Sequence, residues 1–230
     1  MDQLAGISLL AGLPPDERQR LAKRCIWRTF RKDQTVVESA SEDRDVYFVV
    51  SGSVRIVNFA LSGKPVAYAN VGAGQYFGEL AAIDGAPRSA TVLANENCQL
   101  AALAPHAFIE LLQAHPDLSM AVMRRLAAIV RSCDERIMDL ATLGAMQRVI
   151  MELCRLSKPD PITPGSWMIY PCPAQREIAA RASTTRETVA RVFTQLLDSN
   201  QIRRKGRSLY LHDRKALEAL AHRLAPGANV

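Results

Sequence analysis

One short segment of the chain gathers side chains that could hold a sugar and a phosphate together. Residues 77–92 place the carboxylate of Glu79, the guanidinium of Arg88 and the hydroxyl of Ser89 around a turn of small residues. An arginine can fork onto two phosphate oxygens, and a serine hydroxyl with neighbouring backbone N–H groups adds further donors. An ionised glutamate only accepts hydrogen bonds, so it suits a ribose hydroxyl and repels a phosphate. The pattern predicts recognition of a phosphorylated sugar, and the alternative is a solvated surface loop.

A second group of residues, near the C-terminal end, has the spacing of a DNA-reading element. The sequence predicts a short helix over residues 175–181, a tight turn at 182–183, and a second helix that continues to Leu197. Thr184, as the N-cap, and Glu187 fit a capping box at the start of the second helix. The buried face of that helix is predicted to hold Val189, Val192, Phe193, Leu196 and Leu197.

The outward face of the second helix carries side chains that can contact base edges. Arg186 and Arg191 can each donate to O6 and N7 of a guanine, and Glu187 can accept from a cytosine amino group. A helix-turn-helix reads bases with the N-terminal end of its second helix, which here carries Thr185, Arg186, Glu187, Thr188 and Arg191. The alternative is an αα-hairpin with solvated charges and a capping glutamate.

A basic hairpin is predicted directly after these helices. Residues 202–211 fit two short strands around a glycine turn, where Lys205 and Arg207 could rest on DNA phosphates as a wing. Residues 173–214 hold nine Lys and Arg against four acids, so +5 of the chain's formal net charge of +6 lies there. Clustered basic charge is typical of a polyanion partner. A last helix, 214–224, is predicted to close this domain.

A long helix with a narrow apolar seam is expected between the two groups. It would run from about residue 117 to 143, after Pro116, with few breakers before Gly144. Apolar residues at alternating spacings of three and four indicate an a/d seam and a parallel coiled coil, hence a symmetric homodimer. The alternative is that the stripe packs on its own domain. The seam holds Met123, Leu126, Val130, Cys133, Ile137 and Leu140.

The rest of the chain divides into helical and β-rich stretches. Residues 14–30 begin with Pro-Pro-Asp-Glu and predict a short helix, and residues 105–112 predict another. Between about 34 and 103, short β-rich runs alternate with glycines, which indicates a sandwich or barrel of antiparallel strands with a hairpin tip at 63–65. The Pro/Gly/Ser-rich stretch 157–166 predicts a loop.

Composition excludes several classes of protein. The chain has 230 residues, of which 48% are hydrophobic and 23% charged, which suits one large or two ordinary globular domains. The sequence lacks a run of about 18 apolar residues, so we expect no membrane span, and it lacks a basic n-region, so we expect no secretory signal. Five scattered cysteines without a CxxC motif favour neither a metal site nor a disulfide framework, so we expect reducing cytoplasm and no metal. The sequence contains neither a nucleophile elbow nor a Walker loop, so we do not expect an enzyme.

With these motifs in this order, the chain resembles the cyclic-AMP receptor protein/FNR family of bacterial transcription regulators. The resemblance covers about residues 20–212 and is carried by 47–54, 77–92, 140–143 and 185–191. It implies an α+β chain with an N-terminal antiparallel β-sandwich, or jelly roll, that binds a cyclic nucleotide. Residues 1–144, including the dimerisation helix at about 117–143, would form this domain, and residues 145–230 a winged helix-turn-helix domain.

The resemblance also implies roles for individual residues at the nucleotide. Glu79 would bind the ribose 2′-hydroxyl, and Arg88 and Ser89 would bind the cyclic phosphate. Gly78 and Leu80 would contribute backbone groups or part of the wall of the site. The long helix would contact the base through Cys133 and Asp134, where related proteins show Thr-Ser. Either residue can accept from an adenine amino group, and Asp134 can equally accept from a guanine edge. We therefore expect cyclic AMP as allosteric effector, with cyclic GMP as the alternative. A further departure from the family is Ser39-Ala40, which stands where a turn glycine is usual.

The resemblance predicts a homodimer that binds palindromic double-stranded DNA and contacts RNA polymerase. One alternative is a regulator of the same fold that responds to no small molecule. Another is a cyclic-nucleotide module that controls a partner enzyme. The target genes, the operator sequence, the direction of regulation and the polymerase-contacting surface are not encoded in these motifs.

Overall fold

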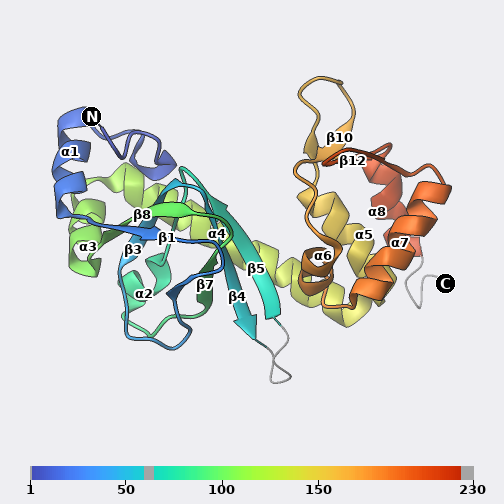
Figure 1. Cartoon of the computed structure of the whole chain (residues 1–230), viewed down its shortest axis with the longest axis horizontal. Helices are drawn as coiled ribbons and strands as arrows, with labels where there is room; N and C mark the ends of the chain where they lie inside the picture. Colours follow the sequence, from blue (N-terminus) through green and yellow to red (C-terminus); the bar gives the residue numbers. More distant parts are fainter. Residues whose placement is uncertain (1, 60–64, 224–230) are drawn as a thin grey trace. The chain divides into compact units, whose positions relative to one another are not determined.

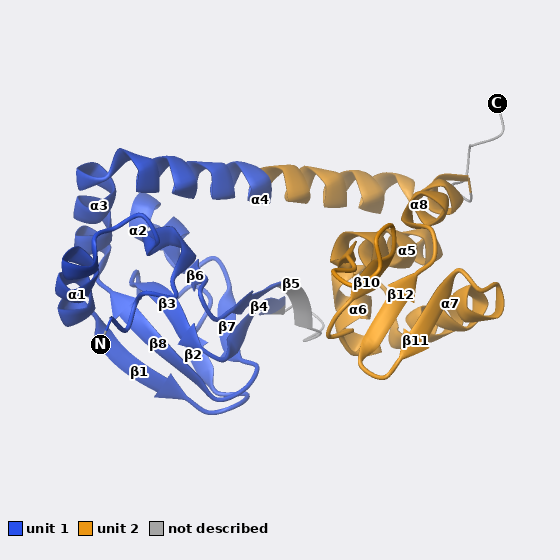
Figure 2. Cartoon of the chain, turned by 90° about the horizontal axis from the view of Figure 1, so that it is seen from above, with its two compact units in different colours: residues 1–129 blue, residues 130–230 orange. Residues whose placement is uncertain are grey.

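The computed structural model describes residues 2–59 and 65–223 of the chain (Figure 1). It divides the chain into two compact units, residues 1–129 and 130–230 (Figure 2). The division falls inside the continuous helix α4 (Pro116–Thr142), which therefore contributes residues to both units. The predicted domain boundary at residue 144 falls instead in the connection after this helix, and it stays a prediction.

The first unit is built on two four-stranded antiparallel sheets, as the glycine-punctuated β pattern predicts. One sheet has the order β1 (Ile26–Phe30), β8 (Cys98–Leu103), β3 (Val46–Ser51), β6 (Tyr76–Phe77). The other has the order β2 (Thr35–Val37), β7 (Thr91–Ala94), β4 (Ser53–Phe59), β5 (Pro65–Gly72). The expected hairpin tip at 63–65 lies outside the described residues, except for Pro65.

Strand β3 shows how the core of this unit is divided. Tyr47 and Val49 pack in the cluster that Val54, Val71 and Val92 of the other sheet share. Val46 and Phe48 pack in a second cluster, with residues of the N-terminal and C-terminal helices of the unit. Because successive side chains of a strand point to opposite faces, this strand is buried on both sides. Its unbroken run of apolar residues follows from that position.

Helices cover the outer face of the first sheet. They are the 3-10 helix η1 (Ser8–Leu10) and helices α1 (Pro15–Arg24), α3 (Pro105–Ala114) and the start of α4 (Figure 1). Their apolar residues join the same cluster as Phe48. The prediction of one helical stretch over 14–30 is wrong beyond Arg24. Residues 26–30 form β1 instead, paired with β8 from Ile26–Ala102 to Phe30–Cys98. This non-local pairing overrides the local helical signal.

The second unit packs helices around a small sheet. Helices α5 (Ala145–Leu156), α6 (Gln175–Arg181), α7 (Arg186–Asp198) and α8 (Arg214–Arg223) share one apolar cluster with the strands. The sheet has the order β11 (Ile202–Lys205), β12 (Ser208–Leu211), β10 (Trp167–Ile169), β9 (Lys158–Pro159). The stretch 157–166 is therefore not entirely loop, since β9 pairs with β10. The predicted hairpin and helices of this unit are present.

No helix within residues 2–59 and 65–223 has both the length and the apolar character that crossing a bilayer requires. In the same ranges, no group of three His, Cys, Asp or Glu side chains could hold a metal ion. All five cysteines are free.

Candidate functional site

The segment that holds Glu79 and Arg88 is a strand, a left-handed glycine and a short helix. Strand β6 ends at Phe77, Gly78 follows with φ of 92°, and helix α2 (Glu79–Asp84) begins at the next residue. A Cβ at Gly78 would lie 2.5 Å from Nη1 of Arg88 and 2.7 Å from the carbonyl oxygen of Asp45. Both the backbone angle and this close approach therefore require glycine.

Glu79 is a buried residue, and its carboxylate has no hydrogen-bond partner among the described residues. The residue is 5% exposed, and no hydrogen bond or ion pair with the described residues holds its side chain. Its oxygens are not among the fully buried polar atoms that lack a partner, so they can be reached from solvent and are suited to accepting from a hydroxyl group that enters the site. Leu80, next along α2, is 44% exposed, as a wall residue would be.

Arg88 is also buried, and its guanidinium is already surrounded by acceptors. Nε and Nη2 donate to the same carboxylate oxygen of Asp43, with an Nε–Oδ1 distance of 3.1 Å. Nη2 also donates to the carbonyl of Asp45, and Nη1 donates to that of Gly78 at 3.1 Å. The guanidinium carbon lies 5.6 Å from the ring centroid of Tyr47. Ser89 is exposed, and its carbonyl accepts from Asn58 Nδ2 at 3.1 Å.

The backbone of Arg88 is held by the loop between β2 and β3. Its carbonyl accepts from the N–H of Ala40 at 2.8 Å, and its N–H donates to the carbonyl of Ser41 at 3.1 Å. Ala40 has φ of 62°, so this turn keeps the left-handed conformation although it has no glycine. Ser39-Ala40 therefore preserves the turn and places the loop against Arg88.

Arg125 links helix α4 to the start of the same segment within the first unit. Its Nη2 donates to the carbonyl of Tyr76 at 2.6 Å, and its guanidinium lies 4.1 Å from the ring centroid of Tyr76. Burial raises the pKa of the Tyr76 phenol, which keeps it protonated. The sequence pattern gave no signal for this contact, since Arg125 and Tyr76 lie 49 residues apart.

Cys133 and Asp134 lie on the part of α4 that belongs to the second unit. Both are exposed. Their predicted contact with a base, and thus their place beside Glu79 and Arg88, stays a prediction. The seam residues around them are also exposed on a single chain, as Val130 at 59% and Ile137 at 62% illustrate.

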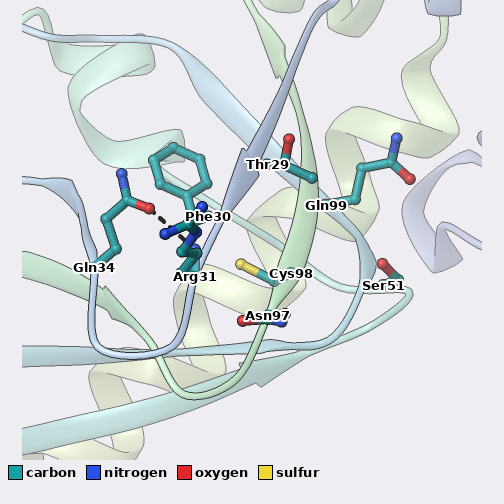
Figure 3. Close-up of a pocket in the computed structure, with 8 residues that line it drawn as sticks. All are labelled: Thr29, Phe30, Arg31, Gln34, Ser51, Asn97, Cys98 and Gln99. Carbon is teal, nitrogen blue, oxygen red and sulfur yellow. Dashed lines mark hydrogen bonds between the residues drawn. The ribbon is translucent and has the colours of Figure 1, made fainter.

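A separate cavity of about 530 Å³ lies at one end of the first unit's sheets (Figure 3). Thr29, Phe30, Ser51 and Cys98 are among the residues that line it, and Gln34 Oε1 accepts from the N–H of Arg31 at 3.0 Å beside it. It shares no residue with the segment of Gly78 to Ser89. The cavity is therefore distinct from the candidate site.

The second group of predicted residues lies on helices α6 and α7, joined by a Schellman motif. Ser183 has φ of 49°, and the N–H of Thr184 donates to the carbonyl of Ala179 at 2.9 Å. Thr184 thus completes the end of α6. Thr185 is the N-cap of α7, with its Oγ1 accepting from the N–H of Thr188 at 3.3 Å. The predicted N-cap at Thr184 is therefore wrong by one residue, and the capping box with Glu187 does not form.

Helix α7 buries one face and exposes the predicted reading face. Val189, Val192, Phe193 and Leu196 are buried, whereas Thr185, Arg186, Glu187 and Arg191 are exposed and Thr188 is half-buried. Leu197 is 39% exposed, so its predicted burial is wrong. It lies at the edge of the buried stripe, one residue before the helix ends.

Arg148 on helix α5 holds the turn between α6 and α7. Its Nε donates to the carbonyl of Ala182 at 2.9 Å, and its Nη2 donates to that of Ser183 at 3.0 Å. Its Nη1 donates to the carbonyl of Leu143 at 2.8 Å. Sequence reasoning missed Arg148, because nothing local indicates a contact with a turn 34 residues away.

The wing predicted after α7 is a hairpin whose basic tip is exposed. Strands β11 and β12 pair from Ile202–Leu211 to Lys205–Ser208, and Gly206 has φ of 57° in the turn. Lys205 and Arg207 flank it and are both exposed. With the exposed end of α7, the hairpin supplies cations of the kind that contact a nucleic-acid backbone.

Comparisons with known proteins match both halves of the chain. The family model of the cyclic nucleotide-binding domain matches residues 27–115, and that of the Crp-like helix-turn-helix domain matches residues 147–220. The cAMP-activated global transcriptional regulator CRP of Haemophilus influenzae is 28% identical over 190 residues, which cover 82% of this chain and 84% of that protein.

Two solved structures are similar in fold. The catabolite activator protein of Thermus thermophilus is 27% identical, with a TM-score of 0.54, over 94% of this chain and 99% of that one. The c-di-GMP responsive global regulator CLP of Xanthomonas campestris has a TM-score of 0.67 and 21% identity, over 86% of this chain and 99% of that one. At that identity the second likeness concerns the fold alone.

Proposed function

Because the chain belongs to the Crp/Fnr family of cyclic-nucleotide-binding transcription regulators, we propose that it is a homodimer switched by cyclic AMP to bind a palindromic DNA site. The observation that supports a cyclic nucleotide as effector is that one short segment carries two buried residues of opposite charge. Within the described part of the chain, the carboxylate of Glu79 has no hydrogen-bond partner, and Arg88 has a buried guanidinium nine residues later. A cyclic nucleotide offers a hydroxyl to the first and an anionic phosphate to the second.

Cyclic AMP is the proposed effector because one relative at 28% identity is described as cAMP-activated and another, also at 28%, as a cyclic AMP receptor protein. Asp134 keeps cyclic GMP as the alternative, since a carboxylate can accept from both N–H groups of a guanine edge. A fold neighbour described as c-di-GMP responsive illustrates that this fold accommodates different effectors.

Calorimetric titration with cyclic AMP and cyclic GMP tests the effector. If cyclic AMP is the effector, it binds more tightly than cyclic GMP, and Asp134→Asn changes that preference little. Glu135→Gln is the matched control, because Glu135 is the adjacent exposed acid on the same helix. Tighter binding of cyclic GMP, lost in Asp134→Asn and kept in Glu135→Gln, would contradict cyclic AMP and make Asp134 a guanine reader.

The DNA half of the proposal rests on the exposed N-terminal end of α7 and the exposed wing. Arg186, Glu187 and Arg191 would contact base edges, whereas Lys205 and Arg207 would contact phosphates. A twofold dimer would present two such helices to successive major grooves, about 34 Å apart. An effector that binds one arrangement of the dimer more tightly shifts the population toward it.

One observation favours a second candidate, a regulator of the same fold that needs no effector. The guanidinium of Arg88 has protein acceptors for most of its donors, so it is stably held without a phosphate. Such a protein would bind its operator with the same affinity whether or not a cyclic nucleotide is added.

RNA polymerase is the further partner that we propose. The loop from Pro159 to Gly165 is the candidate surface, by analogy with the family. Its Ile162 is 87% exposed, although the loop is ordered by Asp160, whose Oδ1 accepts from the N–H of Ile162 at 2.9 Å. An exposed apolar side chain on a backbone held in this way is suited to contact another protein.

A further inference from the structure

Asp43 occupies the binding edge of the residue that is proposed to hold the effector phosphate. A guanidinium has five N–H donors, and a phosphate or carboxylate normally takes two of them along one edge. Arg88 directs Nε and Nη2, one such edge, at the carboxylate of Asp43. The other edge, Nη1 and Nη2, faces the carbonyls of Gly78 and Asp45. Four of the five donors are thus used, and neither edge is open to a second anion.

The two members of this ion pair differ in their freedom to move. The side chain of Arg88 is 4% exposed and that of Asp43 is 28% exposed. The backbone of Arg88 is also fixed, because its carbonyl accepts from the N–H of Ala40 and its N–H donates to the carbonyl of Ser41. Asp43 is therefore the member that can leave the pair by turning toward solvent.

Tyr47 holds Asp43 through the carboxylate oxygen that does not accept from Arg88. Its hydroxyl donates to Asp43 Oδ2 at 2.9 Å, and its ring stacks on Phe77 with centroids 5.1 Å apart. Burial and the hydrogen bond to Asp43 raise the pKa of the Tyr47 phenol, so it remains a donor. The contacts of Asp43 thus connect the loop of residues 38–45 with the segment that precedes Gly78.

A cyclic phosphate and the Asp43 carboxylate each carry one negative charge and require the same donors. Two anions against one buried cation repel each other, so both cannot stay within hydrogen-bonding distance. We propose that Asp43 is an internal competitor for Arg88, which an anionic phosphate must displace, and which thereby lowers the affinity for the effector. This inference rests on the proposed cyclic-nucleotide function and adds a residue that sets its affinity.

Calorimetric titration of Asp43→Asn with cyclic AMP tests the competition. Asparagine still accepts from Tyr47 but no longer offers a charge to Arg88, so cyclic AMP should bind about tenfold more tightly or better. Adenosine, which lacks the phosphate, should bind the variant and the wild type equally. Glu42→Gln is the matched control, because Glu42 is the adjacent acid, its side chain is 77% exposed, and it pairs with Arg44 instead.

A second variant tests the same point if Asp43→Asn folds poorly, which a thermal melt monitored by circular dichroism would show. Tyr47→Phe keeps the stacked ring but removes the donor that holds Asp43, so cyclic AMP should bind about two- to threefold more tightly. Unchanged or weaker binding of cyclic AMP by the folded variants, with the wild type binding it, would overturn the competition and make Asp43 a residue that positions Arg88. Absence of binding of cyclic AMP and cyclic GMP to both wild type and Asp43→Asn would instead overturn the proposed function, and the competition with it.

Discussion

Truncation of Ile137 should weaken the proposed dimer far more than truncation of its neighbour Met138. The two residues are 62% and 59% exposed on a single chain, but only Ile137 lies on the a/d seam. Ile137→Ala removes three carbon atoms, worth about 0.8 kcal/mol each when fully buried. With about 60% of that burial gained in the dimer, each chain loses about 1.5 kcal/mol. Two chains lose about 3 kcal/mol, or about 150-fold in the dimer dissociation constant.

Sedimentation equilibrium measures that dissociation constant directly. Met138→Ala is the matched control, since it removes an equally exposed side chain from the next position and also introduces alanine into the helix. Ile137→Ala should raise the dissociation constant by about 30- to 150-fold, whereas Met138→Ala should change it less than about threefold. Equal effects of the two variants, or none, would refute the seam and favour the alternative that the stripe does not form the dimer contact.

Three further predictions concern the second unit. Arg186→Ala should cost about 1–3 kcal/mol in binding to the specific site and little on random DNA, measured by anisotropy; an equal loss on both would identify a phosphate contact. Phe193→Ala, in the core of this unit, should lower its free energy of unfolding by about 3–5 kcal/mol in urea titration, and a loss below about 1 kcal/mol would contradict the packing. Burial raises the pKa of the Cys154 thiol to about 12, so its stabilising contribution is complete below the unfolded pKa near 9 and is lost as pH rises toward 12. Cys154→Ala should therefore lose stability less steeply than the wild type between pH 9 and 12, and identical slopes would contradict this.

The parts of the site that depend on local spacing could be predicted from the sequence. The sequence placed Glu79 and Arg88 on one short segment because this needs only a few adjacent residues, although it predicted a turn of small residues where the structure has helix α2. Helix α6 has its predicted bounds for the same reason. The N-cap of α7 was misplaced because Thr184 and Thr185 are chemically equivalent caps. The choice between them depends on the Schellman motif that ends α6.

The contacts that hold the site come from distant parts of the chain and left no sequence signal. Asp43 lies 45 residues from Arg88, and Arg148 lies 34 residues from the carbonyl of Ala182. An aspartate in a polar loop and an arginine on an amphipathic helix are usually solvated, so neither stands out. Folding gives both residues a structural role. It buries the guanidinium of Arg88 beside Asp43, and it places backbone carbonyl groups around the guanidinium groups of Arg88 and Arg148.

The central claim, that a cyclic nucleotide switches DNA affinity, is tested most directly by fluorescence anisotropy at one fixed salt concentration. The protein would be titrated onto a labelled palindromic family-type site without nucleotide, with cyclic AMP and with cyclic GMP. We predict that cyclic AMP alone tightens binding, by about tenfold or more for a coupling free energy above about 1.4 kcal/mol. Equal, tight binding under all three conditions would contradict the switch and identify a regulator that needs no effector.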